Sequence, residues 1–446
     1  MKAYIHTWGC QMNEHKSEGI AGVLTQQGYE ITHDPEEADL VIFNTCMVRE
    51  KAEEKVYSEA GVIRKHKEQK PHLLLGVGGC VAQALKDELF KKSSAIDFVF
   101  GTSNITDIPR LIEEAQKRTN GHSPPRSYRP VMAMEKIPDR IEEMPFVRAS
   151  QFQAKVTITE GCSNFCSFCI VPYTMGLLRS RPMTDILYEV KNLAERGYKE
   201  VQLLGQNVDS YGNDVKDPNV NFANLLRQIT FIDIPRIRFT SSHPQDITLE
   251  VIEVMGQKNN ICEHIHMAVQ AGSDRILESM RRGYTKRQFL KLIREIKEGV
   301  PGVNITTDII VGYPTETEQD FQETVDLVKK ARFGGAFIFK YSPRPRTVSY
   351  YKYEDDVSPQ EKQRRLEILL NLQKRIAEEE NKKRIGQVVE VLVEGRNKPD
   401  SNLFYGKTRD NKTVVFEGKD DLIGQFVHVT VRDASVAGLM GELTSN

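Results

Sequence analysis

The chain has 446 residues, more than one ordinary domain holds, so about two to four domains are expected. Its 61 Lys and Arg residues nearly equal its 62 Asp and Glu residues, which excludes a strong overall field toward nucleic acid or membrane. The N-terminus lacks the apolar core of a signal peptide, and the most apolar run is half of the ~20 residues that cross a bilayer. We therefore expect a cytoplasmic protein with no membrane partner.

The first 116 residues alternate short apolar runs with helix-like stretches. The strand candidates are residues 2–10, 38–46, 72–80 and 96–103. This alternation predicts a parallel, Rossmann-like α/β domain over residues 1–116. Three of the strands end on a cysteine, namely Cys10, Cys46 and Cys80. Because parallel strands end along one edge, we expect the three thiols to meet there; buried, inert cysteines are the alternative.

Residues 117–150 carry five prolines and no clear period, which predicts a linker rather than a packed element. Alternation then resumes over residues 151–357. The strand candidates there are 154–162, 200–207, 236–244, 264–272, 304–314 and 335–343. Six βα units predict a partial (β/α)6 barrel, whose site should lie at the carboxyl ends of the strands.

The last part of the chain changes pattern twice. Residues 358–383 read as one amphipathic connecting helix that starts at Ser358 and Pro359. Residues 384–446 hold five short strand patterns with glycine turns, typical of a small antiparallel β-barrel. The fold class is therefore multidomain α/β with a C-terminal barrel.

The stretch GCSNFCSFC places Cys162, Cys166 and Cys169 on the loop after the first barrel strand. Seven cysteines in a reducing compartment favour metal ligation or catalysis over disulfides. A zinc site would need a ligand from elsewhere, since structural zinc takes four. A 4Fe–4S cluster held by three thiolates instead leaves one iron open for a substrate.

Spacing of three and then two, with Phe168 before the last cysteine, resembles the radical S-adenosylmethionine (SAM) signature. GCQMN around Cys10, NTCMVREKAEEK around Cys46 and GCVAQ around Cys80 add a resemblance to the radical SAM methylthiotransferases. The resemblance spans nearly the whole chain, and the Cys46 segment is most similar to the MiaB branch. The C-terminal barrel resembles that family's RNA-binding TRAM domain.

The resemblance implies a transferase that inserts a methylthio group at C2 of isopentenyl-adenosine beside the tRNA anticodon. It implies two SAM and two 4Fe–4S clusters, one on the barrel cysteines, where SAM is cleaved to a radical, and one on Cys10, Cys46 and Cys80, which holds the methylated sulfur that is transferred. Phe168 and four polar residues at strand ends are carried over as candidates for contacting SAM: Gln206, Ser242, Gln270 and Asp308.

The partners implied are the tRNA anticodon stem-loop, a sulfur donor, and an electron donor such as flavodoxin or ferredoxin; the protein is expected to be a monomer. Five residues are candidates for contacting RNA, by stacking or by binding phosphate: Arg49, Arg344, Phe404, Tyr405 and Arg409.

The chain departs from the family at several positions. The family usually has Thr-Arg-Gly-x-Glu-Arg-Ser after the cluster, whereas residues 174–180 read TMGLLRS. MAVQAG stands at 267–272 in place of Leu-Pro-Val-Gln-Ser-Gly, and Arg346 replaces a common glycine. These changes concern contacts near SAM or the substrate rather than the fold.

Two other functions are open. One is a methylthiotransferase that modifies a ribosomal protein aspartate or threonylcarbamoyl-adenosine in tRNA. The other is a non-catalytic iron–sulfur or zinc protein that binds RNA. Cys262 is expected to be a buried small residue, and His264 and His266 to pack in the core or at the barrel mouth.

Overall fold

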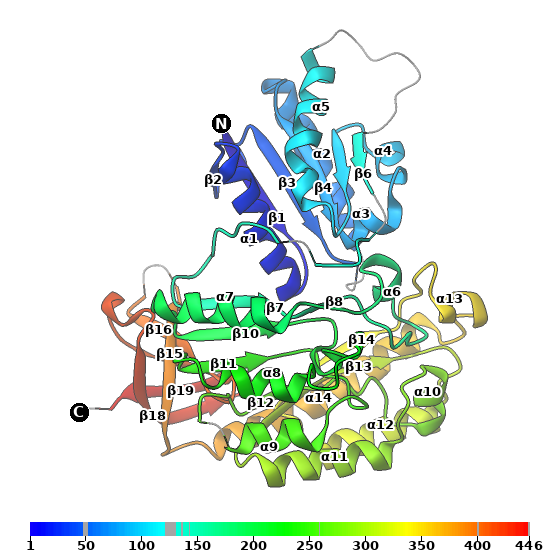
Figure 1. Cartoon of the computed structure of the whole chain (residues 1–446). Coiled ribbons are helices and arrows are strands. Elements are labelled where there is room, and N and C mark those ends of the chain that lie inside the picture. The colour runs from blue at the N-terminus through cyan, green and yellow to red at the C-terminus, as the bar shows by residue number, and fades with distance from the viewer. Residues whose placement is uncertain are drawn as a thin grey trace. The chain divides into compact units, whose positions relative to one another are not determined.

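A computed structural model describes residues 1–47, 52–120, 131–134, 137–141, 143–257, 259–398 and 401–444. The chain forms two compact units (Figure 1). The first consists of Met1–Ser150, Thr159–Ser163 and Ile170–Arg181. The second consists of Gln151–Ile158, Asn164–Cys169 and Pro182–Asn446.

The described part of the first unit is built on a parallel sheet in the order β2-β1-β3-β4-β5-β6. Its strands are β1 (Lys2–Thr7), β2 (Glu30–Thr32), β3 (Leu40–Thr45), β4 (Leu74–Gly79), β5 (Phe98–Phe100) and β6 (Val131–Ala133). Its main helices are α1 (Gln11–Gln26), α2 (Ala52–Gln69), α3 (Cys80–Leu85), α4 (Glu88–Lys92) and α5 (Ile108–Asn120), with a 3₁₀ turn, η1 (Ile105–Asp107). Strands β3 and β4 are buried along their whole length, as expected for parallel strands covered on both faces.

The four strands expected in this unit are present as β1, β3, β4 and β5. Each is shorter than its apolar run, and the cysteines lie just beyond the strands rather than inside them. The sequence reading missed β2, a short, half-exposed edge strand.

The prediction that residues 117–150 contain no packed element is wrong. Helix α5 continues to Asn120, and β6 extends the sheet by pairing with β5. Val131 and Ala133 of β6 are buried in the core. A three-residue strand is too short to give a period, so only its pairing with β5 identifies it.

The chain that follows β6 packs against α1. The Val147 amide donates to the Glu18 carbonyl at 3.0 Å, and the Arg148 guanidinium lies 3.2 Å from the Glu18 carboxylate. A Cβ atom on Gly22 would lie 2.2 Å from the Pro145 carbonyl oxygen. The close approach of this segment to α1 therefore depends on the missing side chain of Gly22.

A short antiparallel pair and one helical turn complete the first unit. Strand β8 (Thr159–Glu160) pairs with β9 (Arg179–Ser180), and α6 (Val171–Thr174) lies between them in sequence.

The second unit begins with a partial α/β barrel. Its strands are β7 (Gln153–Thr157), β10 (Glu200–Leu204), β11 (Arg236–Phe239), β12 (His264–His266), β13 (Asn304–Val311) and β14 (Gly335–Lys340). They form two parallel sheets, β11-β10-β7 and β12-β13-β14. Single bridges join the halves, Ile237 to Ile261 and Ser242 to Met267. This is the expected (β/α)6 arrangement.

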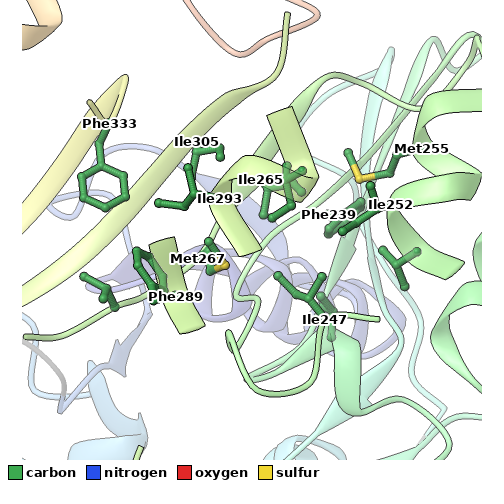
Figure 2. Close-up of a cluster of buried hydrophobic side chains, with 14 of the residues drawn as sticks. Phe239, Ile247, Ile252, Met255, Ile265, Met267, Phe289, Ile293, Ile305 and Phe333 are labelled. Carbon is green, nitrogen blue, oxygen red and sulfur yellow. The ribbon is translucent and has the colours of Figure 1, made fainter. Parts of the chain in front are cut away.

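Helices cover the outside of these strands. They are α7 (Met183–Glu195), α8 (Phe222–Ile229), α9 (Leu249–Gln257), α10 (Asp274–Ser279), α11 (Lys286–Gly299) and α12 (Glu318–Ala331), with a 3₁₀ turn, η2 (Val208–Ser210). Figure 2 shows part of the core between strands and helices, where Ile265 and Ile305 of neighbouring strands lie near Phe289 and Ile293 of α11. This core fixes the strand ends that carry the polar residues described below.

After α13 (Val348–Lys352), the expected connecting helix is α14 (Pro359–Lys382), capped by the Ser358 hydroxyl. The C-terminal strands close into a barrel in the order β15-β16-β17-β19-β18. They are β15 (Val388–Arg396), β16 (Leu403–Thr408), β17 (Thr413–Glu417), β18 (Phe426–Ser435) and β19 (Gly438–Leu443), with η3 (Asp420–Leu422) before β18.

The C-terminal barrel contacts the amino ends of the α/β barrel strands. Arg236, which begins β11, donates to the Glu390 carboxylate at 2.7 Å, and Asn304, which begins β13, donates to the Asp410 carbonyl at 2.8 Å. Within this unit, the C-terminal barrel is therefore anchored at the edge opposite the carboxyl ends of the strands.

No helix in the described part of the chain is long and apolar enough to cross a membrane.

Replacing Gly22 with alanine tests the packing of the chain against α1. We expect the free energy of unfolding to fall by about 1–3 kcal/mol, because the new methyl group overlaps the Pro145 backbone. Gly61→Ala is the matched control: Gly61 lies inside α2 with open space around it, so alanine should leave stability equal or raise it by up to ~1 kcal/mol. Urea denaturation of both variants measures the difference, and equal effects would contradict the assigned contact.

Candidate functional site

Three adjacent strands of the first unit deliver one cysteine each to the same edge of the sheet. Cys10 follows β1 and is the N-cap of α1, Cys46 directly follows β3, and Cys80 directly follows β4 and begins α3. Because β1, β3 and β4 are neighbours and run parallel, their carboxyl ends lie side by side. The structure thus places the three thiols of the N-terminal domain at one edge.

The first two of these cysteines are in direct contact. The Cys46 side chain hydrogen-bonds to Cys10. Gly9 makes this approach possible: its φ is +134°, and a Cβ atom there would lie 2.5 Å from the Cys46 Cβ atom. A glycine before the first cysteine is therefore required both by the backbone conformation and by the space that Cys46 occupies.

The two outer thiols have opposite electrostatic environments. The hydrogen bond from Cys46 lowers the pKa of Cys10 to about 6, and backbone amides at the start of α1 act in the same direction against burial. Burial raises the pKa of Cys80 to about 11, and the charge of Cys10 adds to this effect. A bound cation would favour the thiolate form of all three.

The donor set fits an iron–sulfur cluster. Among the described residues, no three His, Cys, Asp or Glu side chains are gathered as they would be around a single metal ion. Three strand-end cysteines, one of them with a lowered pKa, are the thiolate ligands that such clusters use.

The second cysteine triplet lies on the loop that follows β8. The Cys162 amide donates to the Gly176 carbonyl at 3.1 Å. The Cys169 amide donates to the Cys166 carbonyl at 2.9 Å in one tight turn. All three follow the first barrel strand in sequence, as expected.

Arg282 contacts one of these cysteines. Its guanidinium donates to the Cys166 sulfur at 3.1 Å and to the Ala268 carbonyl at 2.6 Å, and its Nε donates to the Tyr284 hydroxyl. A buried guanidinium favours a thiolate. The sequence reading missed Arg282, and no local motif indicates it, because it lies 116 residues away from Cys166.

The four polar SAM candidates lie on successive barrel strands or just after them. Gln206 follows β10, Ser242 follows β11, Gln270 follows β12, and Asp308 lies within β13. The Gln270 amide donates to the Asp308 carbonyl at 2.8 Å. Gln270 is also held at φ +71°, a conformation that non-glycine residues adopt rarely. Phe168 packs against the barrel core.

A buried polar cluster next to these candidates fits a polar ligand. Asp246 accepts hydrogen bonds from the side-chain amides of Asn164 at 3.1 Å and Asn207 at 2.5 Å. The buried side-chain atoms without a hydrogen-bond partner include Asn207 Oδ1, His243 Nε2 and Gln270 Oε1. Buried polar atoms are rarely left unpaired, so this cluster is suited to the polar groups of a ligand such as SAM.

Three family models match the chain. The model described as uncharacterized protein family UPF0004 matches residues 2–101, the radical SAM superfamily matches residues 156–328, and the TRAM domain matches residues 382–444. They fall, in that order, on strands β1 to β5 of the Rossmann-like sheet, on most of the α/β barrel and on the C-terminal barrel.

Two curated relatives are similar over nearly the full chain. The tRNA-2-methylthio-N(6)-dimethylallyladenosine synthase of Carboxydothermus hydrogenoformans is 45% identical over 99% of this chain and 98% of its own. The protein of the same name from Anoxybacillus flavithermus is 45% identical over 99% of this chain and 82% of its own. This chain belongs to the tRNA-2-methylthio-N(6)-dimethylallyladenosine synthase family. The resemblance to the MiaB branch is thereby confirmed.

Solved structures agree with the fold. The radical SAM methyltransferase TsrM from Kitasatospora setae superposes with a TM-score of 0.55 at 14% identity, covering 78% of this chain and 77% of that one. The cobalamin-dependent radical enzyme OxsB superposes with a TM-score of 0.51 at 11% identity, covering 84% of this chain and 56% of that one. Radical SAM membership implies a 4Fe–4S cluster and SAM.

The structure corrects part of the expected RNA surface of this synthase-family chain. Phe404 is 1% exposed and belongs to the core of the TRAM barrel, so it cannot stack on a base. Arg409 is paired with Glu263 of the radical SAM domain at 2.7 Å, so its charge is already neutralised. Tyr405 is half-buried, Arg344 is also partly buried, and Arg49 lies outside the described residues.

The departures from the family pattern have local structural consequences. Met175 and Leu178 are buried, so the positions where the family usually has arginine and glutamate are apolar here. Arg346, which replaces a common glycine, has φ +76°. The usual glycine is thus explained by backbone conformation, and arginine adopts it at a cost of about 1 kcal/mol.

The residues left over behave as expected from the sequence. Cys262 is buried. His264 is buried beside Thr306, and burial lowers its pKa well below the ordinary value. His266 lies 3.2 Å from the Asp308 carboxylate.

Asp209 makes the stability of this site dependent on pH. Burial raises its pKa to about 7, although the Ser242 hydroxyl and the His243 amide oppose the rise. Below the pKa that Asp209 has in the unfolded chain, the carboxyl is protonated in both states. Between that pKa and about 7, only the folded state holds the proton, so the stability of the fold falls as pH rises through about 7. We expect wild-type stability to fall between pH 5 and pH 8 by about 2–3 kcal/mol more than that of Asp209→Asn. Urea denaturation at both pH values checks this, and parallel pH profiles would refute it.

Proposed function

We propose that this chain transfers a methylthio group to C2 of N6-dimethylallyl (isopentenyl) adenosine beside the anticodon of tRNA. The observation that carries the proposal is the convergence of Cys10, Cys46 and Cys80 at one sheet edge, in a chain that also has the radical SAM cysteines. Two separate three-cysteine sets suit a reaction with two chemical tasks.

Cofactor chemistry is needed because the C2–H of an aromatic base is neither acidic nor electrophilic enough for acid–base attack. When bound, two 4Fe–4S clusters and SAM supply a radical at one site and a transferable methylated sulfur at the other. Cys162, Cys166 and Cys169 would hold the first cluster, and Arg282 would stabilise the Cys166 thiolate.

The remaining residues would bind and orient SAM and the auxiliary cluster. Asn207, His243 and Gln270 offer polar groups to SAM from the strand ends, with Gln206, Ser242, Asp308 and Phe168 beside them as further candidates. The N-terminal cysteines would hold the auxiliary cluster; the pKa of Cys10 is lowered and that of Cys80 is raised.

The substrate implies the partners. The TRAM barrel supports binding of tRNA, with Tyr405 and Arg344 as the candidate contacts left on described residues. We place the reaction in the cytoplasm, with an electron donor and a sulfur donor supplied by other proteins and the chain acting as a monomer. We also propose the boundaries 151–357, 358–383 and 384–446 for the parts that follow residue 150.

Alanine variants of the two triplets should separate the two tasks. Reconstituted wild type should hold about eight irons per chain, and either triple variant about four. The triple variant of Cys162, Cys166 and Cys169 should lose SAM cleavage entirely. The triple variant of Cys10, Cys46 and Cys80 should still cleave SAM to 5′-deoxyadenosine but form no methylthio product. Cys262→Ala, at a buried cysteine outside both sets, is the control and should keep all eight irons. A full yield of methylthio product from the triple variant of Cys10, Cys46 and Cys80 would contradict the role assigned to these three cysteines.

Expression in cells that make isopentenyl-adenosine but lack their own methylthiotransferase tests the substrate. We expect the methylthio derivative of isopentenyl-adenosine to appear in the tRNA nucleosides, measured by mass spectrometry. The N-terminal triple variant is the control and should leave isopentenyl-adenosine unmodified. A methylthio group on threonylcarbamoyl-adenosine or on a ribosomal protein instead would show that the chain acts on that other substrate. No methylthio group at all would favour a non-catalytic RNA-binding role.

A further inference from the structure

A buried lysine lies at the same sheet edge as the N-terminal cysteines. Lys16 is in the second turn of α1 and is only 4% exposed. Its ammonium donates to the Thr102 carbonyl at 2.6 Å and lies 3.0 Å from the Glu160 carboxylate. Lysine is almost never buried so deeply unless its ammonium is paired with an opposite charge.

The carboxylate that Lys16 contacts is shared with a second cation. The Arg179 guanidinium lies 3.1 Å from Glu160 and also donates to the Pro138 and Met175 carbonyls. Two buried cations therefore face one carboxylate among these side chains. A buried charge without a counter-charge is costly, so this arrangement leaves one positive charge to be balanced by an anion.

The contacts of Lys16 lead to Cys80. The Thr102 hydroxyl donates to the Thr174 carbonyl at 2.8 Å, and the Thr174 side chain hydrogen-bonds to the Cys80 thiol. A chain of hydrogen bonds thus runs from the Lys16 ammonium through Thr102 and Thr174 to the Cys80 thiol.

In the described part of α1, the other buried carboxylate already has cationic partners. The next carboxylate along α1, Glu18, is already engaged by Arg148 at 3.2 Å and by His15 at 3.5 Å. The side chains of Lys16, Glu160 and Arg179 also line a small polar cavity together with Thr102 and Met144. Among the residues that line this cavity, Glu160 is the only acid.

We propose that Lys16 is a positioning residue for the second cluster, and that its ammonium balances the negative charge of the thiolates and sulfide held by Cys10, Cys46 and Cys80. This inference rests on the proposed function, since it requires a cluster at these cysteines.

The reduction potential of the second cluster tests the proposal. The parent protein is the full chain with Cys162, Cys166 and Cys169 changed to alanine, so that only the second cluster is loaded. One-electron reduction by dithionite is followed by EPR against mediator dyes. Lys16→Met should shift the midpoint potential to a more negative value, because an added electron then meets less positive charge. Lys16→Arg, which keeps the charge, should restore the parent potential.

Two further variants separate charge from structure. Glu160→Gln removes the shared carboxylate and should shift the potential in the opposite, positive direction. Lys67→Met is the matched control, since the partly buried Lys67 is also paired with a carboxylate, that of Asp97, but at the amino edge of the same sheet. It should leave the potential unchanged.

The outcomes distinguish the existence of the second cluster from the role of Lys16. A parent that holds no iron overturns the proposed second cluster and this inference with it. A parent with about four irons whose potential is the same in Lys16→Met, or is shifted equally by Lys16→Arg, overturns the role of Lys16 alone. If Lys16→Met fails to load iron, Glu160→Gln decides, and an unchanged or negative shift there rejects the proposal.

Discussion

Parallel strand pairing is the constraint on which the rest of the structure depends. In the first unit, β1, β3 and β4 run side by side in the same direction, so whatever follows them is delivered to one edge. Cysteines seventy residues apart in sequence become neighbours by this means alone. In the second unit the same rule brings the residues after β10, β11 and β12 to one end of the partial barrel.

This placement also brings charged side chains together at the carboxyl ends of the strands. Each edge gathers polar and ionisable groups away from water, and each contains groups left incompletely balanced: Lys16 and Arg179 around one carboxylate in the first unit, and buried Asp209 in the second. Such groups cost stability in the protein alone and become favourable when charged cofactors are present. The TRAM barrel occupies the amino edge of the barrel strands, so anchoring and chemistry use opposite ends of the same strands.

Local patterns allowed the strands, the connecting helix and both cysteine triplets to be predicted, because apolar periodicity and spacing are written within short windows. Contacts between distant segments were not predictable, because they depend on tertiary packing. They include the pairing of β6 with β5, the packing of Pro145 on Gly22, the Arg282 contact with Cys166 and the ion pair of Lys16 with Glu160. The error at Phe404 was avoidable. Neighbouring strand residues face opposite sides, so Phe404 and Tyr405 could not both have faced RNA.

The central claim is that the strand-end cysteines of the first unit hold a second iron–sulfur cluster. Anomalous diffraction at the iron absorption edge, from crystals of anaerobically reconstituted protein, tests it most directly. We expect two separate iron sites, one bounded by Cys162, Cys166 and Cys169 and the other by Cys10, Cys46 and Cys80. Iron at the barrel cysteines alone, with ordered but metal-free N-terminal cysteines, would contradict the account.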